Sequence, residues 1–311
     1  MKTPAKGISF GRCYLLPRLA DYAQLTKSRV TTLIIVTAWC GFFFGAHKAG
    51  VPALSWKLLY ALLGIGMVSS GTAALNEVME HDVDARMRRT ARRPIPAGRM
   101  SLLHASLVGS LLAVGGSLYL MFFTNWLTGL LTFLTSAVYL LAYTPLKKVS
   151  PLCTFVGAFP GAMPGVLGWT AASGRLDWGA FALFAILFLW QFPHFFAIAW
   201  MYRDDYASGS IRMLPVVEPD GRSTALRMLF YSLALLPISL APTFLGMTGR
   251  LYLIGALLLG AAFVFFAARV LFMSLPVTDS RSRVYAVQLF RCSILYLPLL
   301  FILMMSNSLS A

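Results

Sequence analysis

Three oxygen-bearing side chains stand four residues apart in the stretch NEVMEHDVDARMRRTARRPIPAGR, which covers residues 76–99. They are Asn76, Glu80 and Asp84, and on an α-helix the positions i, i+4 and i+8 share one face. Mg²⁺ takes oxygen ligands, usually one or two carboxylates together with waters and substrate phosphates. The spacing therefore predicts a magnesium site on the face of a helix.

Six arginines follow these acids between Arg86 and Arg99. Because a guanidinium group binds phosphate oxygens in a bidentate way, acids for a metal ion beside bases for phosphate are typical of a diphosphate site. The alternative is a solvated helix end followed by an ordinary basic loop. We favour the diphosphate site because a second acidic pair, Asp204 and Asp205, follows the sixth apolar stretch of the chain.

The composition places these motifs in a membrane. Hydrophobic residues make up 58% of the 311 and charged residues only 12%, whereas soluble domains carry roughly 25% charged residues. A membrane-spanning helix needs about 20 apolar residues, and such stretches are centred near residues 40, 66, 112, 133, 162, 189, 235, 261 and 296. The sequence predicts an all-α polytopic membrane protein of about nine transmembrane helices. Residues 1–311 would form one domain, with residues 1–28 as a cytoplasmic segment.

The basic residues predict the orientation. With nine spans, 22 of the 26 Lys and Arg residues fall on the side of the N-terminus, and the positive-inside rule puts that side in the cytoplasm and the C-terminus outside. All acids except Asp177 fall on the same side. Four spans separate the two acidic clusters, and an even number of spans returns the chain to the same side of the membrane. We expect both clusters at one cytoplasm-facing cavity. The net charge of +15 is interpreted as topological and lipid-facing, so no nucleic-acid partner is expected.

Targeting signals are weak. The first thirty residues have no apolar core of a cleavable signal peptide, so the plasma (inner) membrane of a bacterium is the simplest location, with the mitochondrial inner membrane as an open alternative. The four cysteines show no C-x-x-C spacing, and neither a cysteine metal site nor a disulfide framework is expected.

Several motifs together resemble one enzyme family. The acidic stretch is similar to the N-x-x-x-D-x-x-x-D region of the UbiA-type intramembrane prenyltransferases, and most closely to their protoheme IX farnesyltransferase (heme O synthase) branch. The further stretches that carry the resemblance are LTKSRV at 25–30, YTPLKK at 143–148, GAFPGAMPGVLGW at 157–169 and WQFPHFFAIAWMYRDDYASGSIRMLPVV at 190–217. They occur in the family's order, and nine spans fit its bundle.

The resemblance implies a transferase that uses farnesyl diphosphate and protoheme IX as substrates, with Mg²⁺ as the helper ion. Asn76, Glu80 and Asp84 then fall on the first motif, as catalytic and metal-binding residues, and Asp204 and Asp205 fall near the second. Glu80 stands where the family usually has Asp, so the metal contact is either direct or shifted to Asp82. Ser28 replaces a usual Pro. The expected diphosphate-binding residues are Lys27, Arg29, Arg89, Arg92, Arg93, Lys147 and Lys148.

His194 has two readings. It lies within the sixth apolar stretch, about ten residues before Asp204, where a histidine usually bonds a neighbouring helix. The family match adds a contact with heme, at the iron or at a propionate. The lipid bilayer and a downstream heme-modifying enzyme or terminal oxidase assembly are further candidate partners.

Two other functions compete with this assignment. One is a sister prenyltransferase that acts on a quinone or chlorophyll precursor. The other is a membrane transporter, which would place its ionisable residues near the middle of the bilayer. Here the acids stand at the predicted cytoplasmic ends of the spans, which favours an enzyme.

Overall fold

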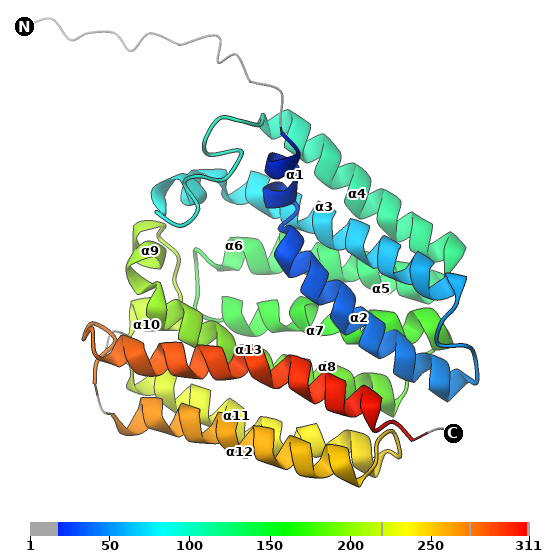
Figure 1. Cartoon of the computed structure of the whole chain (residues 1–311). Helices are drawn as coiled ribbons and strands as arrows, with labels where there is room; N and C mark the ends of the chain where they lie inside the picture. Colours follow the sequence, from blue (N-terminus) through cyan, green and yellow to red (C-terminus); the bar gives the residue numbers. More distant parts are fainter. Residues whose placement is uncertain (1–17, 219, 274, 310–311) are drawn as a thin grey trace, which may run out of the picture.

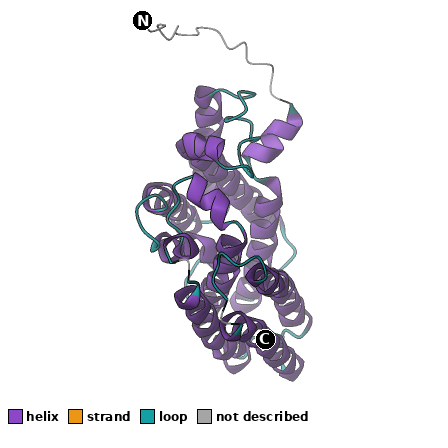
Figure 2. Ribbon diagram, turned by 90° about the vertical axis from the view of Figure 1, so that its left-hand side faces the viewer, coloured by secondary structure: helices purple, strands orange, loops and turns teal. Residues whose placement is uncertain are grey.

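The computed structural model describes residues 18–218, 220–273 and 275–309, and these residues form helices joined by short connections without any β-sheet (Figures 1 and 2). Residues 1–17 of the expected cytoplasmic segment lie outside the described part. The helices are α1 (Leu19–Leu25), α2 (Ser28–Ala49), α3 (Trp56–Arg86), α4 (Leu102–Phe123), α5 (Trp126–Ala137), the π-helix η1 (Val138–Tyr143), α6 (Thr144–Leu146), α7 (Cys153–Ser173), α8 (Trp178–Met201), α9 (Arg203–Ser208), α10 (Leu214–Val217), α11 (Arg222–Phe244), α12 (Arg250–Phe272) and α13 (Ser282–Ser306).

The prediction of about nine spans is confirmed. Each predicted centre falls within a long helix, and among the described residues eight helical stretches are long and apolar enough to cross a membrane, with α5, η1 and α6 counted as one. The ninth is α7, which is less apolar because it is rich in Gly and Pro. The rest of the protein buries 14 of its 21 residues. A helix surrounded by protein does not need a lipid-compatible surface.

Glycines let α7 pack closely on α2. A Cβ atom added at Gly41 of α2 would collide with the backbone carbonyl of Gly165, and one added at Gly168 would collide with that of Ala38. Small residues at such contacts allow helices in lipid to approach and gain van der Waals packing. This contact holds the N-terminal half of the bundle against the C-terminal half.

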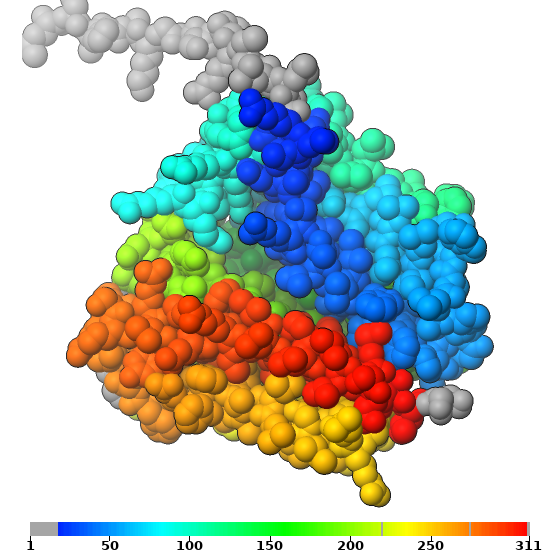
Figure 3. Space-filling view, viewed as in Figure 1, coloured from blue at the N-terminus to red at the C-terminus, as the bar shows by residue number. Residues whose placement is uncertain are grey.

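The short helices and the long connections gather at one end of the bundle. From the top to the left of Figure 1 come α1, the connection from α3 to α4, α6, α9 and α10, whereas the opposite ends of the long helices are joined by short turns. Figure 3 shows a hollow in the molecule near this end, bordered by blue α2, the cyan connection after α3, yellow-green α9 and orange α13. The predicted acidic residues therefore have one place at which to meet.

Candidate active site

The residues at the end of α3 form the centre of the site. Asn76, Glu80 and Asp84 lie on its last turns, and their exposed fractions are only 1%, 6% and 1%. Nδ2 of Asn76 donates to Oε2 of Glu80 at 3.0 Å and to Oγ1 of Thr144 at 3.1 Å. The face that the four-residue spacing predicts is therefore turned into the protein, with its oxygen atoms close together.

Each of these three side chains contacts a basic residue from a different part of the chain. Nζ of Lys27, at the start of α2, donates to Oδ1 of Asn76 at 2.8 Å. Nζ of Lys147, just after α6, lies 2.9 Å from Oε1 of Glu80, and the guanidinium of Arg93 pairs with the carboxylate of Asp84. We call these six residues the charged cluster: Asn76, Glu80, Asp84, Lys27, Lys147 and Arg93.

Local backbone geometry places the two lysines. Lys27 has a φ of +47°, in the left-handed region, where α1 ends and α2 begins. The π-helix η1 inserts a wider turn at the end of the fourth span, and such turns often occur at functional sites. Directly after it come Thr144 and Lys147, and Nζ of Lys147 also lies 4.5 Å from the centre of the Tyr143 ring.

The pKa of Lys27 is lowered to about 7, because burial disfavours its charged form and Arg93 and Lys147 add positive charge nearby. Glu80 and Asp84 act in the opposite direction. An anionic ligand that joins the cluster would favour the charged lysine and raise this pKa again. The cluster therefore has a basic group whose protonation near neutral pH depends on its ligand.

The donor set suits a hard cation. Among the described residues no group of three His, Cys, Asp or Glu side chains is arranged to hold a metal ion by itself. Two carboxylates and one carboxamide do share the buried face of α3, and Mg²⁺ needs few protein ligands when phosphate oxygens complete its shell. Glu80, Asp84 and Asn76 therefore fit Mg²⁺ that arrives with a diphosphate, provided that Lys147 and Arg93 turn from the carboxylates to the phosphates.

Two of the predicted metal ligands lie away from the cluster. The side chain of Asp82 is 83% exposed and lies 3.1 Å from Nε2 of His81, because it is half a helical turn from Glu80 and Asp84. Asp204 is 97% exposed and pairs with Arg203. Asp205 is half-buried. The structure does not bring Asp82 or Asp204 to the buried face of α3.

The second acidic segment nevertheless packs beside the first. Oγ of Ser208, the last residue of α9, donates to the backbone carbonyl of Arg86 at 3.2 Å. The guanidinium of Arg89 lies 5.4 Å from the centre of the Tyr202 ring and 5.5 Å from that of Tyr206. The expected approach of the two helix ends is thus made through aromatic and backbone groups rather than through paired carboxylates.

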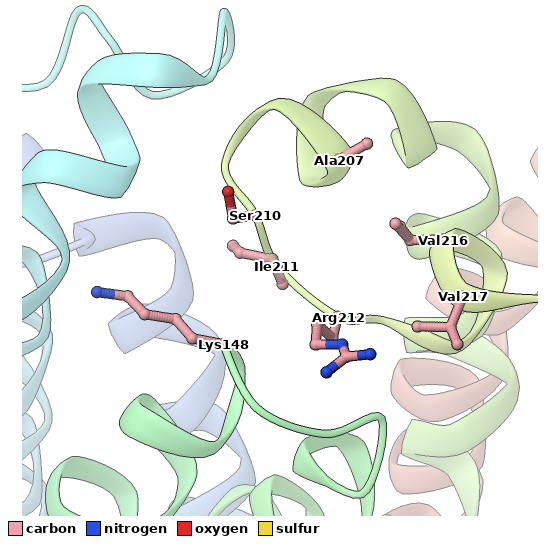
Figure 4. A pocket seen from close by; sticks show the side chains of 7 residues that line it. All are labelled: Lys148, Ala207, Ser210, Ile211, Arg212, Val216 and Val217. Carbon is pink, nitrogen blue, oxygen red and sulfur yellow. The ribbon is translucent and has the colours of Figure 1, made fainter.

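The remaining predicted phosphate ligands lie on the surface of the protein. Arg29, Arg92 and Lys148 are exposed. Lys148 borders a hollow of about 520 Å³ together with Arg212 and Ser210, as Figure 4 shows. The backbone N–H of Arg212 donates to the carbonyl of Lys147 at 2.8 Å, so this hollow adjoins the charged cluster.

His194 contacts the neighbouring helix. Its Nδ1 lies 2.7 Å from Oγ of Ser293 in α13, and its ring stacks on Trp190 with the ring centres 4.6 Å apart. This is the first of the two readings of the sequence. None of the hydrogen bonds among the described residues uses Nε2 of His194, so that atom is the one available to a ligand.

Three further residues support the site, namely Glu77, Asp21 and Thr144, and none of them is predicted as a site residue from the sequence. Glu77 is completely buried, and its Oε1 accepts from the backbone N–H of Ile95 at 3.4 Å. Asp21 of α1 accepts from Nε of Arg99 at 2.7 Å, which ties the connection after α3 to the start of the bundle. Glu77 belongs to the acidic stretch of residues 76–99, so the sequence could have indicated it as a site residue. Asp21 and Thr144 gave no signal, because their partners are distant in sequence.

The model of the UbiA prenyltransferase family matches residues 33–306. The chain belongs to the UbiA prenyltransferase family. The match includes all or most of every long helix of the bundle, and all of the charged cluster except Lys27, which precedes it.

Several relatives of this UbiA chain have curated names. The protoheme IX farnesyltransferase of Koribacter versatilis is 59% identical over 92% of the chain and 93% of its own length. That of Solibacter usitatus is 46% identical over 92% of the chain and 98% of its own length. The prediction from the sequence motifs, a UbiA-type prenyltransferase of the heme-farnesylating branch, is confirmed at the level of these relatives.

Solved structures share the UbiA fold at low sequence identity. A structure of digeranylgeranylglyceryl phosphate synthase superposes with a TM-score of 0.73 at 16% identity, covering 93% of this chain and 98% of that one. A UbiA homologue from Archaeoglobus fulgidus bound to GPP and Mg²⁺ gives a TM-score of 0.59 at 16% identity, covering 91% and 99%. The likeness establishes the fold.

Proposed function

We propose that this chain transfers the farnesyl group of farnesyl diphosphate to a vinyl group of protoheme IX, with addition of water, to give heme O and diphosphate. The observation that carries the reaction type is the charged cluster, in which three buried oxygen-bearing side chains face three basic ones. The acceptor rests on the relatives that bear the name protoheme IX farnesyltransferase.

The basic residues of the cluster stabilise the departing diphosphate. The bond between C1 of the farnesyl group and its bridging oxygen breaks, and the electron pair leaves with the diphosphate. Lys27, Lys147 and Arg93 would turn towards its oxygens and offset the negative charge that develops there. Mg²⁺, held through Glu80, Asp84 and Asn76, would supply further charge stabilisation to the same oxygens.

The apolar interior protects the allylic cation that remains. Phe192 and Phe196 of α8, the helix that carries His194, belong to the large apolar core that several helices of the bundle share. A dry site prevents early capture of the cation by water. The vinyl π electrons form the new bond to C1. Water then adds to the vinyl-derived carbon and loses a proton, which leaves a hydroxyethylfarnesyl side chain.

His194 is the residue that we assign to heme. Its Nδ1 is held by Ser293 and its ring is fixed between Trp190 and Phe290, so Nε2 has a defined direction. A histidine oriented in this way can bind the iron or a propionate. We further propose that the protein lies in the plasma (inner) membrane, with its N-terminus in the cytoplasm and its C-terminus outside.

Heme extraction tests this function. Membranes from cells that express the chain and lack a heme-modifying enzyme of their own should contain a heme that is heavier than protoheme by one farnesyl and one hydroxyl group. The double variant Glu80→Gln, Asp84→Asn serves as the control. Protoheme as the sole heme in membranes that contain the folded wild-type protein would contradict the proposal.

A further inference from the structure

An apolar groove with one arginine at its border lies on the outer surface of the bundle, between α12 and α13. The groove has a volume of about 350 Å³ and an almost wholly apolar lining. The two helices run side by side along the lower part of the face seen in Figure 3, in gold to orange and orange to red. The residues that border it are Leu259, Ala262, Phe266, Gln288, Arg291 and Leu295, with Cys292, Tyr296 and Leu299.

Arg291 is an unusual residue for this position. It is exposed, it stands nine residues after the start of α13, and that corresponds to about 13 Å along the axis. A charged side chain inside a membrane span is costly unless it is paired or reaches the interface. No ion pair or hydrogen bond of Arg291 occurs among the described residues, so the protein leaves this charge without a counter-ion.

The surrounding sequence cannot supply that counter-ion. Between residues 222 and 306 the chain has seven arginines and a single acid, Asp279. Asp279 is engaged by Arg281 at 2.8 Å in the connection before α13. Arg269 is accommodated differently, since its guanidinium packs on the rings of Phe265 and Tyr285. Arg291 alone of these borders the groove, and the anion that it needs must come from outside the chain.

The length of the groove indicates what that anion is attached to. From Gln288 to Leu299 the groove follows α13 for about 16 Å, which is close to half of the ~30 Å hydrocarbon thickness of a bilayer. The end of the groove at which Arg291 lies is nearer to the end of the bundle that holds the candidate active site. Ser282 marks this end, because it accepts from Nε1 of Trp200 at 2.9 Å.

We propose that the groove between α12 and α13 binds one anionic phospholipid of the leaflet on the active-site side. The phosphate would pair with the guanidinium of Arg291, which can reach towards the interface on its apolar stem. One acyl chain would lie along Leu295, Leu299 and Leu259, where the small side chain of Ala262 leaves room for it. Phosphatidylglycerol carries a net negative charge that pairs with Arg291, whereas phosphatidylcholine is neutral overall, and this difference favours phosphatidylglycerol.

Native mass spectrometry of the whole protein in a non-ionic detergent tests the site, with phosphatidylglycerol and phosphatidylcholine of identical chains as probes. The wild type should retain one phosphatidylglycerol at least tenfold more tightly than phosphatidylcholine. Arg291→Gln should remove this preference, and Ala262→Phe, which fills the space for the acyl chain, should weaken both lipids. Arg283→Gln, an exposed arginine on the same helix outside the groove, should bind as the wild type does.

Prenyl transfer in lipid-free detergent should be the same in all four proteins and shows that the variants are folded. Equal binding of the two lipids to the wild type, or a preference that survives Arg291→Gln, would overturn the proposal. Displacement of the bound lipid by stoichiometric farnesyl diphosphate would also overturn it, because the groove would then be a substrate site.

Discussion

Nζ of Lys147 lies 2.9 Å from Oε1 of Glu80, although 67 residues and two spans separate them in the chain. The pair is buried, and a buried carboxylate and ammonium are stable only because each offsets the charge of the other. A ligand that brings its own anionic groups and a metal ion can exchange these partners. The pair therefore leaves the site charge-balanced while no diphosphate is bound.

Removal of either buried carboxylate should abolish most of the activity. We expect Glu80→Gln and Asp84→Asn each to lower kcat by about 10²-fold or more, because metal positioning is lost. Glu80→Asp should retain activity. The matched control is Asp82→Asn, whose exposed side chain is 83% accessible, and it should behave as the wild type. Steady-state kinetics across a Mg²⁺ titration gives the answer, and full turnover of Asp84→Asn in chelator would rule out this site.

Substrate binding should weaken above neutral pH. Lys27 has a pKa of about 7 in the free protein, and a bound diphosphate should raise it, so binding is strongest where the lysine is already protonated. The KM for the prenyl diphosphate should therefore rise about tenfold between pH 6.5 and 8.5. Lys27→Arg stays charged throughout and should show a flat profile. A wild-type profile that is already flat over this range would remove Lys27 from the diphosphate site.

His194 should affect the use of heme more than the use of the prenyl donor. His194→Ala should raise the KM for protoheme with little change in the KM for farnesyl diphosphate, whereas Ser293→Ala, which frees the Nδ1 atom, should have a smaller effect in the same direction. Both constants come from one two-substrate kinetic experiment. Equal increases for the two substrates would indicate that the histidine only packs α8 against α13.

Close packing of α2 and α7 should make Gly168 sensitive to a single methyl group. Gly168→Ala forces a Cβ atom into the carbonyl of Ala38, and we expect a loss of about 1–3 kcal/mol with a lower unfolding temperature in detergent. Gly115→Ala on α4 is the matched control, because nothing lies within 4 Å of an added Cβ there. Identical thermal unfolding of the two variants would contradict the close approach.

Reporter proteins fused to the C-terminus can determine the orientation of the bundle in the membrane. A phosphatase fused after α13 should be active, since that enzyme works only outside the cytoplasm, and a fluorescent protein fused at the same place should be dark. The prediction follows from the excess of Lys and Arg at the N-terminal side of nine spans. The opposite pattern would mean that one of the nine helices does not cross the membrane.

Periodicity explains what the sequence could predict. Apolar length gave the spans, and the four-residue spacing of Asn76, Glu80 and Asp84 correctly predicted a shared helix face. The same periodicity disfavours a place for Asp82 on this face, because Asp82 is two residues from Glu80 and from Asp84 and so lies on the opposite side of the helix. The resemblance had kept Asp82 as an alternative only because Glu80 replaces the family's usual Asp.

Contacts between distant segments could not be predicted in this way. Nothing local indicates that Lys147 meets Glu80, since their approach depends on the π-turn of η1 and on how α5 packs against α3. Asp204 was expected at the site because it follows the sixth span, on the same predicted side of the membrane as the first acidic cluster. Instead α8 ends at Met201 and α9 starts again at Arg203, and this break turns Asp204 to solvent.

The central claim is that the charged cluster activates farnesyl diphosphate for attack by protoheme. The most direct test incubates purified protein with protoheme IX, farnesyl diphosphate and Mg²⁺ in H₂¹⁸O and measures the mass of the extracted heme. The account predicts a product heavier than protoheme by one farnesyl group and one ¹⁸O-labelled hydroxyl group, and no product from the Glu80→Gln, Asp84→Asn double variant. Unchanged protoheme, together with prenylation of 4-hydroxybenzoate or a naphthoate offered in its place, would contradict it.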